Sequence, residues 1–478
     1  MTTAIDLDTE RARRAPREAV TFVTGDHAEM AVALLAELGP PEWMRAAHNT
    51  LYAYDDTLGI WQPADRARAS QIVQSFSGRM TLTEQPKPIR IRASDVSGAI
   101  QLAQDRVTVP EFFDKAPHGL AFRNGFLRLV HGQLRLVPHS PSHGARYAYP
   151  FACDDGATCP QWEQCLLDAF RGDADAGEKI AAIQEYAGAS LLGFATRFTR
   201  AIVMYGNGAN AKSVVAEVIA SAFPPGSTCA IPPQTWGNEY RLALLAGKLL
   251  NVVNELPEAD ILAGETFKGI VDGNQTTARP IREAPFDYHP RAGHLCAANR
   301  LPQSNDQSHG FWRRMMVIEF NRTFASHEQD TTLAERIIRE ETPGIVAWMV
   351  AGARRAIQQG QLTIPPSSVS AVRNWQHASD PISLFVAEKT RRPKLDETRS
   401  TCAEVFDAYA TWAEKNRFKV MSSASFGRRM SGLGFPSEAG HECYFYPVRL
   451  LALGEKPDPI VMPEDRPPTQ DPAEDWNR

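Results

Sequence analysis

The residues with the most specific chemistry lie where a run of apolar residues passes into a helical pattern. Residues 201–205 are apolar and β-prone, and the glycine- and asparagine-rich residues 206–211 follow them directly. Lys212 and Ser213 then open an apolar-periodic stretch that predicts a helix. In such a loop, backbone N–H groups bind phosphate oxygens, a lysine reaches the terminal phosphates and a hydroxyl ligates Mg²⁺. The predicted phosphate-binding residues are Gly206, Gly208, Asn210, Ala211, Lys212 and Ser213.

Ala211 departs from the usual form of this loop, which carries glycine immediately before the lysine. Alanine enters positive φ only at an energetic cost, so we expect either a slightly reshaped loop or a conformation in which Gly206 and Gly208 absorb the strain. An ordinary strand, turn and helix with a chance Lys-Ser pair is the alternative interpretation. The residues further along the chain provide the evidence that distinguishes a phosphate-binding loop from an ordinary turn.

Two later apolar runs end in side chains that a nucleotide-hydrolysing site requires. Residues 248–255 end in Glu255, and a carboxylate beside a phosphate loop can polarise the attacking water and support Mg²⁺ through it. Such a run is common, and Asn254 stands where many ATPases have an aspartate for the metal. Residues 294–299 end in Asn299, whose amide can contact both the γ-phosphate and the attacking water. Both ends would lie beside the phosphate loop in a parallel sheet.

Two adjacent arginines, Arg313 and Arg314, stand immediately before a further apolar run at residues 315–320. A guanidinium delivered from a neighbouring subunit would neutralise the charge that develops on a transferred phosphoryl group. Each of these segments is a weak signal alone. Their order after one phosphate loop predicts a nucleotide-driven motor.

A basic segment lies between these runs. Lys268, Arg279 and Arg282 surround a turn at residues 272–274. A hairpin of this kind can grip a nucleic-acid backbone without reading its bases. A solvated surface turn is equally compatible with the pattern.

Composition limits the classes of protein and partner. With 478 residues the chain should hold about three domains, and its formal charge of −5 makes any nucleic-acid surface a local patch. Seven cysteines, an odd number, predict a reducing compartment. No apolar run approaches the roughly 18 residues of a membrane span, so we expect a cytoplasmic protein with no membrane partner.

The C-terminal region has a pattern of its own. Residues 398–416 carry an apolar helical stripe, a short capped helix with Arg428 and Arg429 follows, and residues 443–450 alternate like a strand. Helix, turn, basic helix and hairpin predict a winged-helix domain whose two arginines face DNA. A domain that serves only subunit contacts is the alternative.

Together these motifs resemble the superfamily 3 helicases of the phage and plasmid primase–helicase group (D5-like, P4-type), which are related to poxvirus D5-type proteins. Residues 206–213 are similar to the Walker A form of that family, which carries an additional asparagine. Residues 299–302 resemble its sensor strand, and Arg313 with Arg314 resembles its arginine finger. The spacing from Arg314 to Phe320 is also similar to that of papillomavirus replicative helicases, which favours Arg314 as the finger.

The resemblance extends upstream, where residues 111–193 are similar to the D5 N-terminal region. It implies an α/β fold with an AAA+-like P-loop ATPase core of superfamily 3 type, an α+β D5-like N-terminal domain and a C-terminal winged-helix domain. The expected boundaries are a charged N-terminal lead-in at 1–48, a β-rich D5-like region at 49–152, a helical collar at 153–196, the ATPase core at 197–350, a helical linker at 351–378, the winged helix at 379–452 and a disordered acidic tail at 453–478.

The resemblance also implies an ATP- and Mg²⁺-dependent DNA helicase for the replication of a phage, plasmid or other mobile element. Such a protein works as a homo-oligomeric ring, expected to be a hexamer, on single-stranded and forked DNA, with 3′→5′ movement. A fused primase has no room upstream, so a separate primase or initiator is an expected partner. The implied site residues are Lys212, Glu255, Asn299 and Arg314 for catalysis, Ser213 and, through water, Glu255 for Mg²⁺, and Lys268, Arg279, Arg282, Arg428 and Arg429 for DNA.

Two other classes stay open. Ala211 and Asn254 are compatible with an ATP-controlled DNA-binding initiator or structural ring that unwinds little. An ATPase that remodels nucleoprotein partners, with the N-terminal region as its adaptor, is the second. Unwinding of a forked duplex separates the three.

Overall fold

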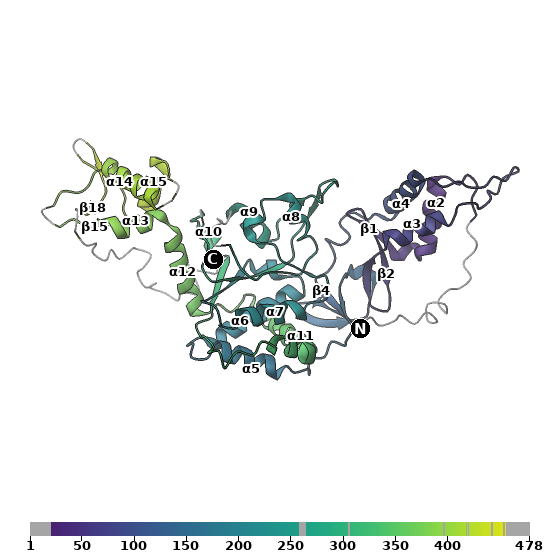
Figure 1. Ribbon diagram of the computed structural model, residues 1–478, viewed down its shortest axis with the longest axis horizontal. Helices are drawn as coiled ribbons and strands as arrows, with labels where there is room; N and C mark the ends of the chain where they lie inside the picture. Colours follow the sequence, from purple (N-terminus) through teal and green to yellow (C-terminus); the bar gives the residue numbers. More distant parts are fainter. Residues whose placement is uncertain are drawn as a thin grey trace. The chain divides into compact units, whose positions relative to one another are not determined.

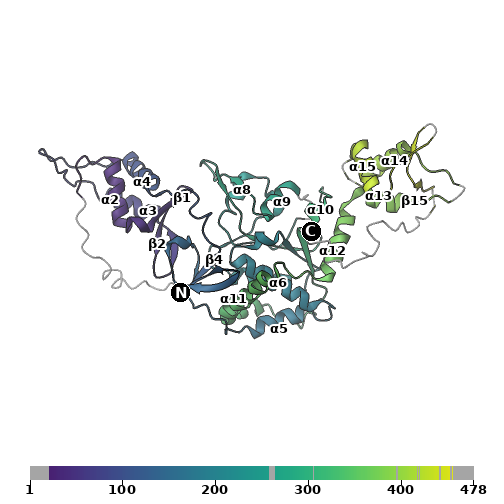
Figure 2. The ribbon, with the colours of Figure 1, turned by 180° about the vertical axis from the view of Figure 1, so that it is seen from behind.

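The structure is a computed structural model that describes residues 21–257, 264–304, 306–394, 397–416, 418, 420–440, 443–452 and 455. The chain forms two compact units, which are Met1–Arg128 with Leu136–Ala152, and Leu129–Arg135 with Cys153–Arg478. Figures 1 and 2 show the ribbon from opposite sides. The predicted acidic tail at 453–478, except Glu455, and residues 1–20 of the predicted lead-in lie outside the described residues.

In the first unit, helices and an antiparallel sheet share one apolar core. α4 shows how the sequence builds it, because Val96, Ala99, Ile100 and Ala103 recur every three or four residues and are buried. The region predicted to be β-rich therefore also contains helices. The elements are α2 (His27–Leu38), β1 (Met44–Ala47), β2 (Thr50–Asp55), β3 (Ile60–Pro63), α3 (Arg66–Gln74) and α4 (Ala93–Val107).

A four-stranded sheet has the strand order β6-β5-β4-β7. A turn at His131 and Gly132 joins β5 to β6, and both residues have positive φ (48° and 77°). A two-residue turn of this kind matches the twist of the strands that it connects. The strands are β4 (Gly119–Phe122), β5 (Gly125–Val130), β6 (Gln133–Val137) and β7 (Ala148–Tyr149).

The second unit is built on a five-stranded sheet with the order β14-β8-β13-β10-β9, in which every pair is parallel. The apolar runs that predicted strands form β8, β10, β13 and β14. Their residues are buried almost throughout, as a parallel sheet covered on both faces requires. The strands are β8 (Ala201–Tyr205), β9 (Thr228–Cys229), β10 (Leu250–Val253), β13 (Gly293–Ala298) and β14 (Met315–Glu319).

Helices cover both faces of this parallel sheet (Figures 1 and 2). On one side are α5 (Pro160–Ala169), α6 (Ala176–Leu191), α7 (Lys212–Ala222) and α11 (Leu333–Gln359), and on the other α8 (Glu239–Ala243), α9 (Gly264–Val271) and α10 (His309–Trp312). α6 and α11 can approach closely because Gly188 stands at their contact, where a Cβ would lie 2.8 Å from the backbone nitrogen of Ala353. A small antiparallel hairpin, β11 (Thr276–Ala278) and β12 (Phe286–Tyr288), extends from this layer.

The chain continues through α12 into a small C-terminal cluster with its own apolar core. The helix, the basic helix and a short hairpin follow in the order expected from the sequence, but the predicted strand at 443–450 is two short strands, at 444–445 and 449–450, which pair with different partners. None of the described helices is long and apolar enough to cross a bilayer. The elements are α12 (Pro366–Ser379), α13 (Pro381–Lys389), β15 (Thr390–Arg391), α14 (Cys402–Lys415), α15 (Ser423–Gly432), β16 (Glu438–Ala439), β17 (Tyr444–Phe445) and β18 (Arg449–Leu450), and the short 3-10 helices elsewhere are η1 (Pro41–Trp43), η2 (Pro141–His143), η3 (Ala195–Phe198) and η4 (Pro233–Thr235).

Candidate active site

The loop at 206–211 turns the chain from the end of β8 directly into α7. Positive φ angles occur at Gly206 (156°), Gly208 (69°), Ala209 (45°) and Ala211 (68°). Ala211 therefore adopts the left-handed conformation itself, so the two glycines do not absorb all of the strain. A loop of this kind before a helix N-terminus presents N–H groups to an anion.

Ala211→Gly should raise the free energy of unfolding by at most about 1 kcal/mol. A left-handed non-glycine residue costs about 1–2 kcal/mol, and the greater freedom of glycine in the unfolded chain offsets part of the gain. Thermal unfolding without nucleotide measures the change. The control is Ala220→Gly in α7, where the same exchange at a helical position should cost about 1 kcal/mol. Equal losses of stability in the two variants would show that Ala211 is not strained.

The segment after β14 holds the loop in place. Phe320 N–H donates to Tyr205 O (2.8 Å), and Phe324 N–H donates to Ala209 O (2.7 Å). The buried Asn210 side chain donates through Nδ2 to Phe320 O (3.2 Å). A Cβ at Gly206 would lie 2.6 Å from Phe320 O, so glycine is required there for the close approach. The asparagine that distinguishes this loop thus ties it to the neighbouring strand.

Lys212 lies at the centre of the site. Its side chain is buried, and the ammonium donates to Gly206 O, to Asn210 Oδ1 (3.2 Å) and to Asn299 Oδ1 (3.2 Å). Burial lowers the pKa of Lys212 below its ordinary value. Ser213, the second residue of α7, is exposed at the same helix end. The structure therefore brings the predicted lysine and the predicted sensor asparagine within hydrogen-bond distance.

Glu255 and Asn299 lie at neighbouring strand ends. Because β10 and β13 are parallel, the residues that follow them reach the same edge of the sheet, and Leu256 N–H donates to Ala297 O (2.8 Å). Both side chains line one hollow of about 500 Å³, together with Leu256, Pro257 and Arg300. Glu255 is exposed there. Lys212, Asn299 and Glu255 thus follow three adjacent strands at one edge.

Arg314 lies where the parallel strands begin, immediately before β14, whereas the loop at 206–211 lies where the strands end. Only about 8% of its side chain is exposed. The guanidinium forms a bidentate salt bridge with Asp272, in which Nε donates to Oδ1 (2.7 Å) and Nη2 donates to Oδ2. Nη1 donates to Gly310 O. The five residues of β8 separate the two edges by about 16 Å, at about 3.3 Å per residue. Arg314 therefore does not reach the phosphate loop of its own chain.

Arg313 lines a different feature, a hollow of about 220 Å³ that also contains Arg197 and Arg200. Arg200 donates to Arg313 O, and burial, together with the charges of Arg313 and Arg314, lowers the pKa of Arg200 to about 10. Sequence analysis missed Arg197 and Arg200. The available signal was their position just before β8, because parallel strands begin at the same edge.

The residues predicted to contact DNA lie in three places. Lys268 is on α9 and pairs with Asp306 (2.9 Å), so it is not part of the hairpin. Arg279 and Arg282 lie in the loop between β11 and β12, where Arg282 has a positive φ of 65°. Arg279 lies 3.9 Å from Glu239 and donates from Nε to Glu283 O (3.1 Å).

The two arginines of α15 differ in their surroundings. Arg428 is exposed and donates to Ser425 Oγ (3.2 Å). Arg429 is held by the buried carboxylate of Asp380, with Nη2 at 2.7 Å and Nε at 2.8 Å from Oδ2. Of the two, Arg428 is the one whose side chain extends into solvent without a carboxylate partner in the described part of the chain.

Two parts of the chain match known protein families. Residues 41–171 match the family described as "D5 N terminal like". Residues 204–314, which include the loop at 206–211 and Arg314, match the "Family of unknown function (DUF5906)". A frog virus 3 protein named "Putative helicase 022R" is 25% identical over 203 residues, which is 38% of this chain and 20% of that protein. The chain thus spans about a fifth of the length of this relative.

Structures of the NrS-1 C-terminal region are among the solved structures that match this chain. The structure titled "The apo structure of NrS-1 C terminal region (305-718)" is 10% identical, covers 86% of this chain and 96% of that chain, and has a TM-score of 0.42. The structure titled "The A form apo structure of NrS-1 C terminal region-CTR" is 15% identical, covers 48% and 56%, and has a TM-score of 0.34.

Proposed function

Because the chain belongs to the D5-like primase–helicase family, we propose that it is a replicative DNA helicase driven by ATP hydrolysis. The observation that carries the proposal is the ammonium of Lys212, which joins the loop after β8 to Asn299 after β13. Glu255 lines the same hollow as Asn299. A phosphate-binding cation, a γ-phosphate sensor and a carboxylate for the attacking water would then share one edge of the sheet.

The residues present fit a nucleoside triphosphate with Mg²⁺. The three oxygens that now accept from Lys212 Nζ show that a cation is held where the loop, the helix N-terminus and β13 meet. Loop N–H groups and Lys212 would bind phosphate oxygens, Ser213 would ligate Mg²⁺, and Glu255 would orient water. Bound ATP supplies the phosphoryl group whose hydrolysis drives movement. The sheet order supports a P-loop ATPase core of the AAA+-like superfamily 3 type.

A ring is part of the proposal, because Arg314, the predicted arginine finger, does not reach the loop at 206–211 of its own chain. The arginines precede β14 at one edge of the sheet, and the phosphate loop follows β8 at the other. Arg300 lines the hollow in the same chain, and an arginine from a second copy would add a further cation to neutralise the transferred phosphoryl group. We propose Arg314 for this role, with Asp272 holding its guanidinium until the neighbour binds, and a homo-oligomer, expected to be a hexamer.

DNA contacts are proposed for two surfaces. Arg279 and Arg282 flank the exposed tip of the β11–β12 hairpin, where Ile281 is 76% exposed. Movement of this hairpin with the nucleotide state would carry single-stranded DNA, 3′→5′ as in the family. The C-terminal cluster is proposed as a winged helix, with Arg428 toward DNA.

Unwinding of a forked duplex by the purified protein tests the proposal. Wild type should displace a strand with ATP and Mg²⁺, and Glu255→Gln should lower ATP turnover by about 10²–10⁴-fold while nucleotide binding persists. Glu335→Gln, an exposed carboxylate in the first turn of α11, is the matched control. A protein that hydrolyses ATP but displaces no strand would instead be an initiator ring or a nucleoprotein remodeller.

A further inference from the structure

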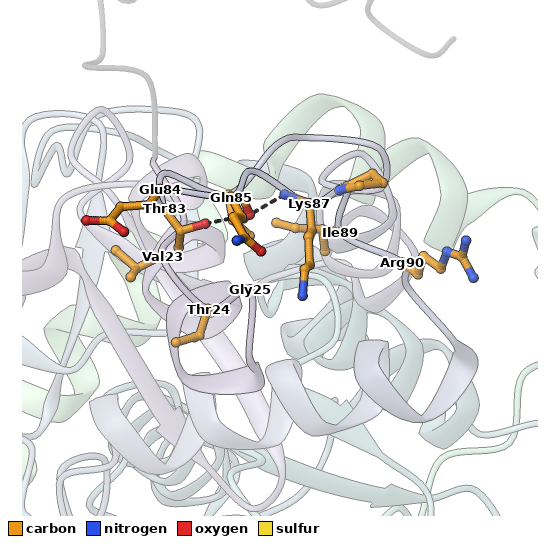
Figure 3. Close-up of a pocket in the computed structure, with 11 residues that line it drawn as sticks. Val23, Thr24, Gly25, Thr83, Glu84, Gln85, Lys87, Ile89 and Arg90 are labelled. Atoms are coloured by element: carbon orange, nitrogen blue, oxygen red, sulfur yellow. Dashed lines mark hydrogen bonds between the residues drawn. The ribbon is translucent and has the colours of Figure 1, made fainter.

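A hollow of about 660 Å³ in the first unit lies against the hairpin formed by residues 79–92, which carries excess positive charge (Figure 3). Residues from two segments, 23–25 and 81–90, line it. In the view of Figure 3, Glu84 lies at the left end of the hollow, Lys87 extends downward near its centre and Arg90 lies at the right. Neither the phosphate loop nor the β11–β12 hairpin belongs to this unit.

Hydrogen bonds and the burial of one side chain fix the hairpin to the core of the unit. Thr81 N–H donates to Lys87 O (3.0 Å), Lys87 N–H donates to Thr81 Oγ1 (3.0 Å), and Ile89 N–H donates to Arg79 O (2.9 Å). The Ile89 side chain is buried in the core of the unit with Phe76. Ligand binding would therefore require little ordering of the backbone, which lowers its entropic cost.

The hairpin is cationic within an acidic protein. Residues 79–92 contain four cations, namely Arg79, Lys87, Arg90 and Arg92, and one carboxylate, Glu84, whereas the whole chain carries a formal charge of −5. Lys87, Arg90 and Arg92 are exposed. These three side chains have no ion pair within the part of the chain that the structure describes. The positive charge of the hairpin therefore faces solvent.

Two further carboxylates lie near the segments that form the hollow, and one of them, Asp95, accepts from Arg92 N–H (2.7 Å) and interacts electrostatically with that arginine. Glu29 accepts from the backbone N–H groups of Val23, Thr24 and Gly25 at 2.8–3.1 Å. Asp95 lies 3.0 Å from His27 Nε2. Glu84 is the carboxylate that lines the hollow itself.

We infer that this basic hairpin, residues 79–92, binds the sugar–phosphate backbone of duplex DNA. Lysine and arginine beside hydroxyl and amide groups, here Thr24, Thr83 and Gln85, suit phosphate oxygens. No aromatic side chain lines the hollow, so a stacking platform for unpaired bases is missing among the described residues, and duplex is favoured over single strand. That the nucleic acid is DNA rests on the proposed function, in which the duplex arm of a fork must be held.

Fluorescence anisotropy of a labelled blunt duplex, measured with the full chain over a salt series and without nucleotide, tests the inference. The double variant Lys87→Gln/Arg90→Gln should bind about tenfold more weakly at low salt, and the slope of log K against log salt should fall by about 2, since each phosphate contact contributes about 0.9. Arg90→Lys keeps the charge and should bind like wild type, because a point charge suffices for a phosphate contact.

Arg106→Gln/Arg123→Gln is the matched control, since it removes two exposed cations of the same unit outside the hairpin. Thermal unfolding of each variant checks that the fold is kept. The inference is overturned if the hairpin variant binds duplex as wild type does, or if it loses no more affinity than the control. It is also overturned if single strand is preferred through the same residues, or if anionic vesicles, which the exposed Leu82 could favour, bind while duplex does not.

The measurement is independent of unwinding. Lys212→Ala should bind duplex in the same way as wild type, because the phosphate loop lies in the other unit. Duplex binding through the hairpin without ATP-driven unwinding would sustain this inference and reject the proposed function. If Lys87→Gln/Arg90→Gln still unwinds a fork and binds duplex as wild type does, the proposed function is sustained and this inference is rejected.

Discussion

Lys212→Ala should abolish ATP hydrolysis, with a loss of about 10²–10³-fold or more, and with it all strand displacement. The ammonium is the positive charge at the meeting point of the loop, α7 and β13, held by oxygens of Gly206, Asn210 and Asn299. Without it, the terminal phosphates would lose the cation that stabilises their charge in the transition state. Steady-state phosphate release measures the effect.

Lys212→Arg separates charge from shape. The planar guanidinium keeps the charge but cannot occupy a buried pocket built for an ammonium, so this variant should also be inactive. Lys248→Ala, which removes a lysine from the loop before β10, is the control and should retain hydrolysis. The stabilisation by ATP in thermal unfolding, about 2.7 kcal/mol at a hundredfold excess over Kd, should disappear only in the Lys212 variants. Normal turnover by Lys212→Ala would remove the loop from the active site.

Arg314→Ala should lower ATP turnover by about 10³-fold or more when all subunits carry it, and mixing with Lys212→Ala subunits should restore part of the activity. Lys212→Ala subunits keep their arginine, and Arg314→Ala subunits keep their phosphate loop. Because the two groups lie at opposite edges of one sheet, a productive pair can form only between copies. The rate of ATP hydrolysis should therefore pass through a maximum as the ratio of Arg314→Ala to Lys212→Ala subunits is varied.

Two variants keep this test decisive. Arg314→Ala leaves the carboxylate of Asp272 without its two-pronged partner, so Arg314→Ala/Asp272→Ala, which removes both charges, checks for a folding defect. Arg313→Ala addresses the neighbouring hollow with Arg197 and Arg200. Complementation by Arg313→Ala but not by Arg314→Ala would transfer the intersubunit role to Arg313. Failure of every mixture would argue against a shared site.

Much of the candidate site was predictable from the sequence because its parts follow strands. The apolar runs predicted β8, β10, β13 and β14, and residues after parallel strands must meet at one edge. The sequence alone therefore predicts that Lys212, Glu255 and Asn299 lie together. The helices α3 and α4 were not predicted, since α4 marks its buried face partly with alanine, which is a weak hydrophobic signal.

The sequence by itself determined the glycine-rich loop at 206–211, the strands around it and the order of the side chains at their ends, because local composition and period specify these features. Only the tertiary structure decided which charges are engaged. Asp272 holds Arg314, Asp306 pairs with Lys268, and Asp380 holds Arg429. Partners such as these lie tens of residues apart, and no local pattern encodes a contact that forms when separate elements pack. The tertiary structure also decided that the cations of the hairpin at 79–92 are exposed, because the fold brings no carboxylate within ion-pair distance of Lys87, Arg90 or Arg92 among the described residues.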